Sequence, residues 1–521
     1  MMQLPEDFEI DLLIELDEPD ENLAIAQYIS QKLGVAPEIL PPFEIKRRAI
    51  DARHGKVRFL LTVGTVPTGE VVLAEPKPRA VQGAPVLIIG AGPAGLFCAY
   101  ELARQGIASI IFDRGKMVQA RRRDLKGLTQ HGVVDSDSNY CFGEGGAGTY
   151  SDGKLYTRSH KRGDVRDVLE ILVAHGAPEN ILTDARPHIG SNRLPKVITA
   201  LREHLESLGV RFEFERRVVD ICVDGELAVG VRLHDGTEVS GRSVVVATGH
   251  SARDMIDILA RIGADLEAKP FAMGVRIEHP QPIINKIQYG RFADHPKLAA
   301  APYRLAYTPE DGRGAFSFCM CPGGWIVPAS TEAGELVVNG MSLSRRDSPY
   351  ANSGLVVAIT VEDSVRAGLS QPLGGIELQR RIERAAWNAG GGELCAPAVR
   401  ATDFVKRRTS STLPATSYEP GLKSADMEAI LDSCGLPIAT RLREALLAFS
   451  KKMPGYLCEE AVLVGVETRT SSPVRVLRDA VSFMSPSIRN LYPCGEGAGY
   501  AGGIVSAAMD GAIVARAIGK V

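Results

Sequence analysis

The side chains in this sequence that are best suited to chemistry follow glycine-rich turns or apolar strands. Lys154 comes after an Asp-Gly turn, where its ammonium could contact a phosphate or could be an ordinary surface lysine. His250 follows an Ala-Thr-Gly turn and could donate a proton, although a structural histidine is the alternative. Arg276 lies on a predicted strand, where it could hold an acidic substrate group or form an internal ion pair.

Cys319 and Cys321 form a close pair among the nine cysteines. A buried strand edge, a substrate-lining thiol and a redox disulfide are the three open interpretations of this Cys-Met-Cys segment. A disulfide at this spacing would be strained, and redox-active dithiols typically have the spacing Cys-x-x-Cys. No His, Cys, Asp or Glu residues have metal-ligand spacing, so the sequence predicts no metal site.

The stretch VLIIGAGPAG, residues 86–95, has the composition of a nucleotide-binding turn. Its apolar residues predict a buried strand, and a helical pattern over residues 96–105 follows. The glycines in the spacing G-x-G-x-x-G are Gly90, Gly92 and Gly95. The first makes a tight turn, the second lets backbone approach a pyrophosphate, and the third lets helix pack on strand. A second apolar run, residues 107–112, is followed by Asp113. This acid lies about 20 residues after the glycine motif, where a carboxylate would bind the adenosine ribose. This order predicts a bound adenine dinucleotide.

The same glycine spacing recurs at Gly143 (GEGGAG) and at Gly497 (GAGYAG). No apolar strand precedes the first of these matches, and too little chain follows the second for another strand and ribose acid. The sequence therefore predicts one adenosine half-site. We expect the other two loops to bring their backbone against a flat ring or a pyrophosphate of the same ligand.

Apolar periodicity divides the chain into four segments. Residues 1–80 indicate a small β-α-β-β unit with a ferredoxin-like or related fold. Residues 83–268 hold the dinucleotide strands and helices, and residues 269–469 mix strands and turns as an inserted substrate or cap domain. Residues 470–521 return to the dinucleotide domain with a short strand, a glycine turn and a final helix. The predicted fold class is α/β: a Rossmann-like domain with an inserted mixed α+β domain and a small N-terminal α/β domain.

The composition is that of an ordinary globular protein. Of 521 residues, 45% are hydrophobic and 24% are charged, and the net charge of −3 gives no sign of stable nucleic-acid binding. We expect no signal peptide, no membrane span and a cytoplasmic location with reduced thiols. A basic cluster near the N-terminus is either a solvated strand face or an anion or nucleic-acid contact; its members are Arg47, Arg48, Arg53 and Lys56.

Three segments of the chain are similar to the three FAD-binding segments of glutathione-reductase-type flavoproteins: GAGPAG with Asp113, DGTEVSGRSVVVATGH, and LYPCGEGAGYAGG. The segment CFGEGGAGTYSDGKL narrows the resemblance to a largely uncharacterised family of bacterial FAD-dependent dehydrogenases. The wider relatives of that family include geranylgeranyl reductases. The resemblance covers residues 83–521, and the N-terminal unit also resembles the extra domain of this family. It implies that the dinucleotide is FAD.

The resemblance also implies which residues contact FAD. It assigns the glycines of the first loop to the pyrophosphate and Asp113 to the ribose, and it puts the backbone near Ile504 against flavin N1 and O2. Where such proteins usually have Gly-Asp, this chain has Gly495-Glu496, which is longer by one methylene. Lys154 would lie near flavin N5 or a phosphate. The other expected contacts are Pro93, Ala94, Arg114, Gly145, Gly146, Ser151, Gly153, Val219, Thr248, Gly249, Gly502 and Gly503.

Together these features predict an FAD-dependent oxidoreductase that transfers hydride between flavin N5 and a small organic substrate. The candidate catalytic residues are Lys154, His250, Arg276 and Cys319. A complete nicotinamide domain is missing from the sequence pattern, so NAD(P)H is expected at most as a transient electron donor. A flavin monooxygenase and a flavin-bound RNA-associated or regulatory protein are the alternatives.

Overall fold

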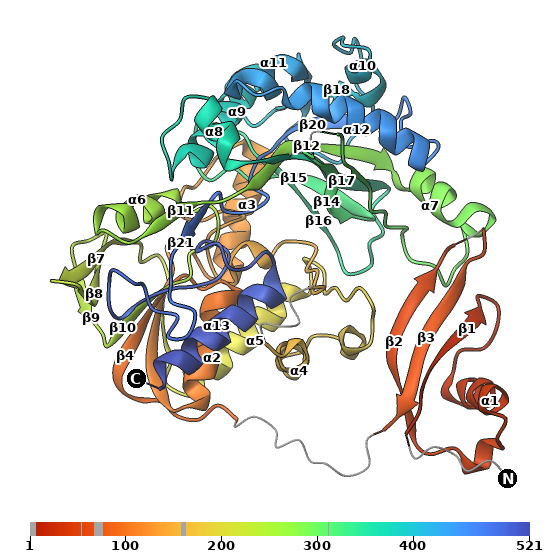
Figure 1. Cartoon of the computed structure of the whole chain (residues 1–521), viewed down its shortest axis with the longest axis horizontal. Coiled ribbons are helices and arrows are strands. Elements are labelled where there is room, and N and C mark those ends of the chain that lie inside the picture. Colours follow the sequence, from red (N-terminus) through yellow and green to blue (C-terminus); the bar gives the residue numbers. More distant parts are fainter. Residues whose placement is uncertain (1–6, 54, 67–76, 158–162, 311, 521) are drawn as a thin grey trace.

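The computed structural model describes residues 7–53, 55–66, 77–157, 163–310 and 312–520 (Figure 1). It shows a central parallel sheet with its helices, a cap domain built on a second large sheet, and a small N-terminal unit to one side. Residues 67–76, at the end of the predicted N-terminal segment, lie outside the described residues.

The dinucleotide domain is organised around a five-stranded parallel sheet of order β22-β10-β4-β5-β6. Its strands are β4 (Gln82–Ile89), β5 (Ile107–Phe112), β6 (Arg211–Glu213), β10 (Ser243–Val246) and β22 (Leu491–Pro493). Alternate side chains point to opposite faces: Val86 and Ile88 pack under the helices, whereas Leu87 and Ile89 pack on the other side. Because both faces are covered, residues 86–89 of β4, 110–112 of β5 and 244–246 of β10 are buried and continuously apolar rather than alternating.

Helices cover one face of this sheet, and a three-stranded meander packs on the other (Figure 1). The helices are α2 (Pro93–Arg104), α4 (Val165–Ala174), α5 (Leu194–Ser207) and α13 (Ile504–Ile518), and the meander is β7 (Val218–Asp224), β8 (Leu227–Leu233) and β9 (Glu238–Ser240). The predicted first strand and helix are confirmed, but α2 begins at Pro93 rather than residue 96. Proline is favoured at the first helical position, and glycine and proline hide the apolar period there.

The cap domain has a mixed seven-stranded sheet of order β13-β14-β17-β12-β20-β18-β19. Its strands are β12 (Phe271–Pro280), β13 (Ala306–Tyr307), β14 (Ala315–Cys321), β17 (Tyr350–Ile359), β18 (Ala396–Arg400), β19 (Leu422–Ser424) and β20 (Val462–Glu467), with a separate pair β15 (Gly324–Pro328) and β16 (Val338–Ser342). The helices are α7 (Gln281–Tyr289), α8 (Val361–Arg366), α9 (Gly374–Gly390), α10 (Ala401–Val405), α11 (Met427–Leu431) and α12 (Ile438–Lys452). The apolar periodicity of residues 374–388 and 437–449 predicts two helices, and α9 and α12 confirm them.

The chain enters and leaves the cap domain side by side. Strand β11 (Leu266–Ala268) pairs antiparallel with β21 (Val474–Val476), so the two connections between the domains form a two-stranded ribbon. Nearby, α6 (Arg253–Arg261) and α3 (Val118–His131) complete the dinucleotide domain. This arrangement is what an insertion into a continuous domain requires, since the inserted segment begins and ends at one place.

The N-terminal unit has the predicted β-α-β-β order, with β1 (Glu9–Glu15), α1 (Asn22–Leu33), β2 (Phe43–Asp51) and β3 (Arg58–Thr65). Both outer strands pair antiparallel with β3, giving the order β1-β3-β2. It contacts the dinucleotide domain through backbone hydrogen bonds of Arg48 with Thr183 and Ala185, each 2.8 Å long. It contacts the cap through an ion pair of Lys297 with Asp20, 3.3 Å long.

Candidate cofactor and substrate site

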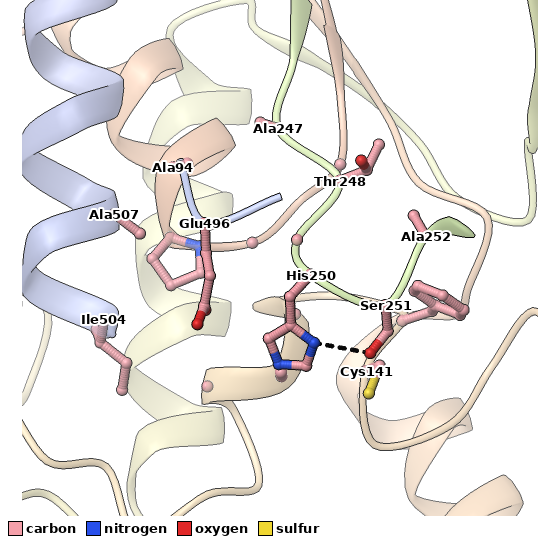
Figure 2. Close-up of a pocket in the computed structure, with 18 of the residues that line it drawn as sticks. Ala94, Cys141, Ala247, Thr248, His250, Ser251, Ala252, Glu496, Ile504 and Ala507 are labelled. Atoms are coloured by element: carbon pink, nitrogen blue, oxygen red, sulfur yellow. Dashed lines mark hydrogen bonds between the residues drawn. The ribbon is translucent and has the colours of Figure 1, made fainter. Parts of the chain in front are cut away.

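A cavity of about 350 Å³ lies between the dinucleotide domain and the cap domain. It opens at the carboxyl ends of β4, β5 and β10, where open α/β sheets bind their ligands. All three glycine-rich loops reach it, and the cap contributes Phe318, Cys319, Asn339, Arg469 and Thr470. Figure 2 shows part of this lining, including Thr248, His250 and Glu496.

In the first glycine loop, residues 90–95, each of the three glycines is required for a different steric reason. Gly90 has φ +108°, and a Cβ there would lie 2.5 Å from the carbonyl oxygen of Ala247. A Cβ on Gly95 would lie 2.0 Å from the Gly90 oxygen, so this glycine lets α2 pack on β4. Gly92 differs, because a Cβ there would meet nothing closer than Gly146 Cα at 3.8 Å. Gly92 therefore leaves open space on the pocket side, as close approach of a ligand to backbone requires.

The second glycine loop, residues 143–148, lies directly against the first. The Gly145 amide donates to the Ala91 carbonyl at 2.8 Å, and a Cβ on Gly146 would be 3.0 Å from Gly92 Cα. The fully buried guanidinium of Arg121 holds this loop by donating to the carbonyls of Asn139, Tyr140, Glu144 and Gly146 at 2.8–2.9 Å. In the sequence Arg121 is one of three consecutive arginines, residues 121–123, and nothing in that pattern shows which of them is buried.

The third loop leads into α13, whose N-terminus also faces the cavity. Gly502, Gly503 and Ile504 line the cavity. A Cβ added to either glycine would have no neighbour within 4 Å. The N-termini of both α2 and α13 lack a side-chain cap. Their free backbone N–H groups and positive dipole ends suit anionic ligand groups such as a pyrophosphate. The cavity therefore fits the phosphate-bearing cofactor that the glycine loops predict.

Asp113 and Arg114 lie at the carboxyl end of β5. The two carboxylate oxygens of Asp113 accept the backbone amides of Ala91 and Gly115, each at 2.8 Å, so Asp113 also shapes the first loop. Arg114 pairs with Asp137 and Asp254 at 2.7 and 2.9 Å and covers the Phe142 ring. Asp113, Arg114 and Phe142 all line the cavity.

Lys154 and Cys319 meet across the domain boundary. The Lys154 ammonium lies 3.7 Å from the sulfur of Cys319 and 3.7 Å from that of Cys321. Lys154 and Cys319 line the cavity, whereas Cys321 is fully buried. None of the nine cysteines forms a disulfide. This contact joins two residues that the sequence offered separately as catalytic candidates.

His250 faces the cavity as a neutral imidazole. Burial, together with the nearby Arg469 and Arg253 guanidinium groups, lowers the pKa of His250 to about 4. Its Nδ1 atom hydrogen-bonds the Ser251 hydroxyl at 2.8 Å (Figure 2). His279, near the end of β12, is buried outside this cavity, and its Nε2 atom hydrogen-bonds the Tyr456 carbonyl at 2.7 Å.

Arg276 is enclosed in the cap domain and does not line the cavity. Its guanidinium pairs with Glu467 at 2.8 Å and also donates to the Cys319 carbonyl at 2.8 Å. The structure thus shows the internal ion pair rather than a free group for an acidic substrate. Asn352 and Asn339 accept its remaining hydrogen bonds at 2.9 and 3.1 Å.

The predicted contact residues divide into two groups by position. Those that line the cavity are Gly90, Gly92, Pro93, Ala94, Asp113, Arg114, Gly146, Ser151, Gly153, Lys154, Thr248, Gly249, Glu496, Gly502, Gly503 and Ile504. Those that do not are Gly95, Gly145, Val219 and Gly495. The sequence left Val218 and Val219 as alternatives at the start of β7, and Val218 lines the cavity, because alternate residues of a strand face opposite sides. The Gly495 amide donates instead to Asp510 at 2.7 Å. Residues missed from sequence are Phe318, Asn339 and Met255, which carry no motif.

Two acidic features influence the field around the cavity. Burial raises the pKa of Glu496 to about 7, although the Lys269 ammonium opposes this. Behind the cavity wall, Glu383 pairs with both Arg253 and Arg469 at 2.9 Å and is fully buried. These ion pairs join α6 of the dinucleotide domain to α9 of the cap.

Among the described residues, no group of three or more His, Cys, Asp or Glu side chains could hold a metal ion.

Family models assign the class of this protein. Residues 83–132 match an FAD binding domain, and residues 270–470 match the description "FAD-dependent protein, C-terminal domain-like". Residues 6–65 match a domain of unknown function. The chain is therefore an FAD-binding flavoprotein, in agreement with its three glycine loops and its parallel sheet.

A curated relative assigns the family. The chain is 40% identical over 529 residues to an uncharacterized protein of Clostridium beijerinckii, covering 97% of each chain, and it belongs to one family with that protein. Among solved structures, CtdE in complex with FAD is 14% identical, covers 84% of each chain and has a TM-score of 0.33. Glycine oxidase from Geobacillus kaustophilus is 13% identical, with 84% of this chain and 95% of that chain covered and a TM-score of 0.37.

In the described part of the chain, no helix combines the length and the apolar character that crossing a membrane requires.

Proposed function

We propose that this protein is an FAD-dependent dehydrogenase or reductase that moves hydride between the flavin and a small organic substrate. The observation that carries this proposal is the shared cavity, which is lined on one side by the three glycine loops and on the other by cap residues. A cofactor held by the loops would thus meet a substrate held by the cap. When bound, FAD supplies the hydride chemistry at flavin N5.

The residues of the chain then have distinct roles. The N-terminus of α2, which begins after Gly92, would hold the pyrophosphate, and the N-terminus of α13, at Ile504, would stabilise the negative charge that the flavin gains on reduction. Phe318 and Asn339 offer a substrate one apolar and one polar contact from the cap. His250 is not a cationic acid near pH 7, because its pKa is about 4. Lys154, whose ammonium lies beside Cys319, is one of the cations that line the cavity, together with arginines such as Arg469.

A direct experiment tests this function. The purified protein is expected to be yellow, with the visible absorbance bands of oxidised flavin, and to bleach when a donor reduces it. Candidate donors, including NADH and NADPH, are screened for bleaching, and enones and quinones are then screened for reoxidation without oxygen. Enones test carbon–carbon double-bond reduction, the reaction suggested by the resemblance to geranylgeranyl reductases. A colourless protein that does not take up FAD would refute the proposal.

The same assay separates the alternatives. Oxygen uptake coupled to a hydroxylated product would identify a flavin monooxygenase. Salt-dependent RNA binding would favour an RNA-associated protein only if it required the N-terminal basic cluster. Two of its members are already paired, Arg48 with Asp20 and Arg53 with Asp51, at 2.6 and 2.7 Å.

Nine free cysteines are consistent with a reducing cytoplasm as the place of this reaction.

A further inference from the structure

Cys319 lies where strand β14 departs from regular pairing. The register between β14 and β17 shifts between Phe318 and Cys321, and Cys319 has φ +44°, a left-handed conformation that is rare outside glycine. The Cys319 side chain is exposed and lines the cavity, whereas Cys321 is buried. The irregularity therefore turns one thiol of the Cys-Met-Cys segment into the cavity.

The Lys154 ammonium is directed at this thiol by the dinucleotide domain. A bridge between Lys154 and His188 holds its backbone, and its Nζ atom lies 3.7 Å from both sulfurs. The nearby carboxylate of Asp152 is occupied by Arg346 at 2.6 Å. Among the described residues, the hydrogen-bond contacts of this ammonium are thus with the two sulfur atoms.

The groups around Cys319 favour its thiolate. The Cys321 thiol lowers the pKa of Cys319 well below its usual range, with Lys154 and Arg276 acting in the same direction, while burial and Asp152 oppose them. Cys321 has its own pKa raised well above the usual range, so it stays a thiol and can donate.

Two carboxyl groups on other elements also face this thiolate. Burial raises the pKa of Glu467, on β20, although its partner Arg276 at 2.8 Å opposes this, and burial raises the pKa of Glu496, in the third loop, to about 7. At pH 6.5 Glu496 is mostly protonated, and the Arg276 guanidinium offsets the charge of Glu467, so both add little negative charge beside the sulfur. An assay at this pH tests the Lys154–Cys319 contact with the least interference.

We propose that Cys319 is a nucleophilic thiolate, paired with the Lys154 ammonium, that adds to α,β-unsaturated carbonyl compounds in the cavity. The sulfur electron pair forms a bond to the β-carbon, and the electron pair of the C=C bond moves toward the carbonyl as an enolate. A proton of the Lys154 ammonium then passes to the α-carbon. Nothing is oxidised or reduced, and the reverse steps release the compound. This reaction does not require flavin turnover, so it is separable from the proposed hydride transfer.

The expected rate advantage follows from two opposing factors. An ordinary cysteine with a pKa near 8.5 is about 1% thiolate at pH 6.5, so a fully ionised thiol gains about 100-fold in reactive form. The lower basicity of such a thiolate also costs nucleophilicity, with a slope of about 0.5, so about half of this gain on a logarithmic scale is lost. We therefore expect Cys319 to react about tenfold faster than an ordinary thiol.

The test uses the FAD-loaded protein and N-ethylmaleimide, whose C=C bond is conjugated to two carbonyls. At pH 6.5, peptide mapping by mass spectrometry is expected to show Cys319 labelled about tenfold faster than Cys222, a partly exposed reference thiol whose pKa burial raises. K154M should reduce the Cys319 rate to that of the reference thiol, and K154R should keep most of it. Equal rates for the two thiols, or fast labelling that persists in K154M, would overturn the proposal.

Two further measurements test the proposal without a Lys154 variant, and so they do not depend on whether such a variant folds. In the unmodified protein, the Cys319 rate should rise much less between pH 6.5 and 8.5 than the Cys222 rate, because the pKa of Cys319 is lowered whereas that of Cys222 is raised; parallel profiles contradict the ion pair. Incubation with 2-cyclohexen-1-one should add one molecule per protein at Cys319, and C319S should lose this addition. Absence of the adduct in the unmodified protein would overturn the assigned ligand class.

Discussion

Replacing Gly92 with alanine is expected to weaken FAD binding without destabilising the fold. The Gly92 backbone has φ −77° and ψ −177°, an extended conformation that alanine adopts freely. The new methyl would meet no protein atom closer than 3.8 Å, at Gly146 Cα. Because both glycines line the cavity, the methyl takes up the space between them where the pyrophosphate approaches.

The size of the effect follows from the contacts that a displaced phosphate would lose. A hydrogen bond from a backbone N–H to a charged group contributes about 1.5–3 kcal/mol. Loss of one such bond at the N-terminus of α2 corresponds to about a 10- to 150-fold higher Kd for FAD. The free energy of unfolding of the FAD-free protein should change by less than about 0.5 kcal/mol.

The assay titrates FAD-free protein with FAD, following flavin fluorescence, and measures unfolding in urea for the same samples. G127A is a matched control, since Gly127 lies in α3, a Cβ there would have no neighbour within 4 Å, and Gly127 does not line the cavity. It should stabilise the helix by about 0.5–1 kcal/mol and leave FAD binding unchanged. Wild-type FAD affinity in G92A would refute the argument that phosphate approaches this backbone.

Three more predictions concern stability. G95A should destabilise the protein by about 1–3 kcal/mol in urea unfolding, because its Cβ would lie 2.0 Å from a backbone oxygen; an unchanged midpoint contradicts this packing. E383A should cost about 3–5 kcal/mol, because it removes one of the two buried carboxylates, Glu383 and Glu335, that Arg253 and Arg469 share, with E383Q as a milder control. The pKa of His250 is about 4 when folded and near 6.5 when unfolded, so the unfolded chain binds more protons between these values. Stability should therefore fall as pH drops from 6.5 to 4, and H250Q should show a shallower fall in urea midpoints measured across this range.

Local features of the chain were predictable because they depend on neighbouring residues. The strand before Gly90, the helix after it and the strand ending at Asp113 follow from periodicity and turn chemistry, and the structure confirms them. The helices α9 and α12 were recognisable for the same reason. Boundaries were less accurate, as at Pro93, since glycine and proline interrupt the apolar period.

The sequence by itself determined that one adenosine half-site exists, because strand, glycine turn, helix, strand and acid form one continuous segment. Only the tertiary structure decided that the three glycine loops line one cavity, since they lie far apart along the chain. It also decided which groups the individual side chains contact: Arg276 forms an internal ion pair with Glu467, whereas Cys319 lies beside Lys154. The physical reason is that residue type sets what a group can do, whereas burial and long-range contacts set what it faces.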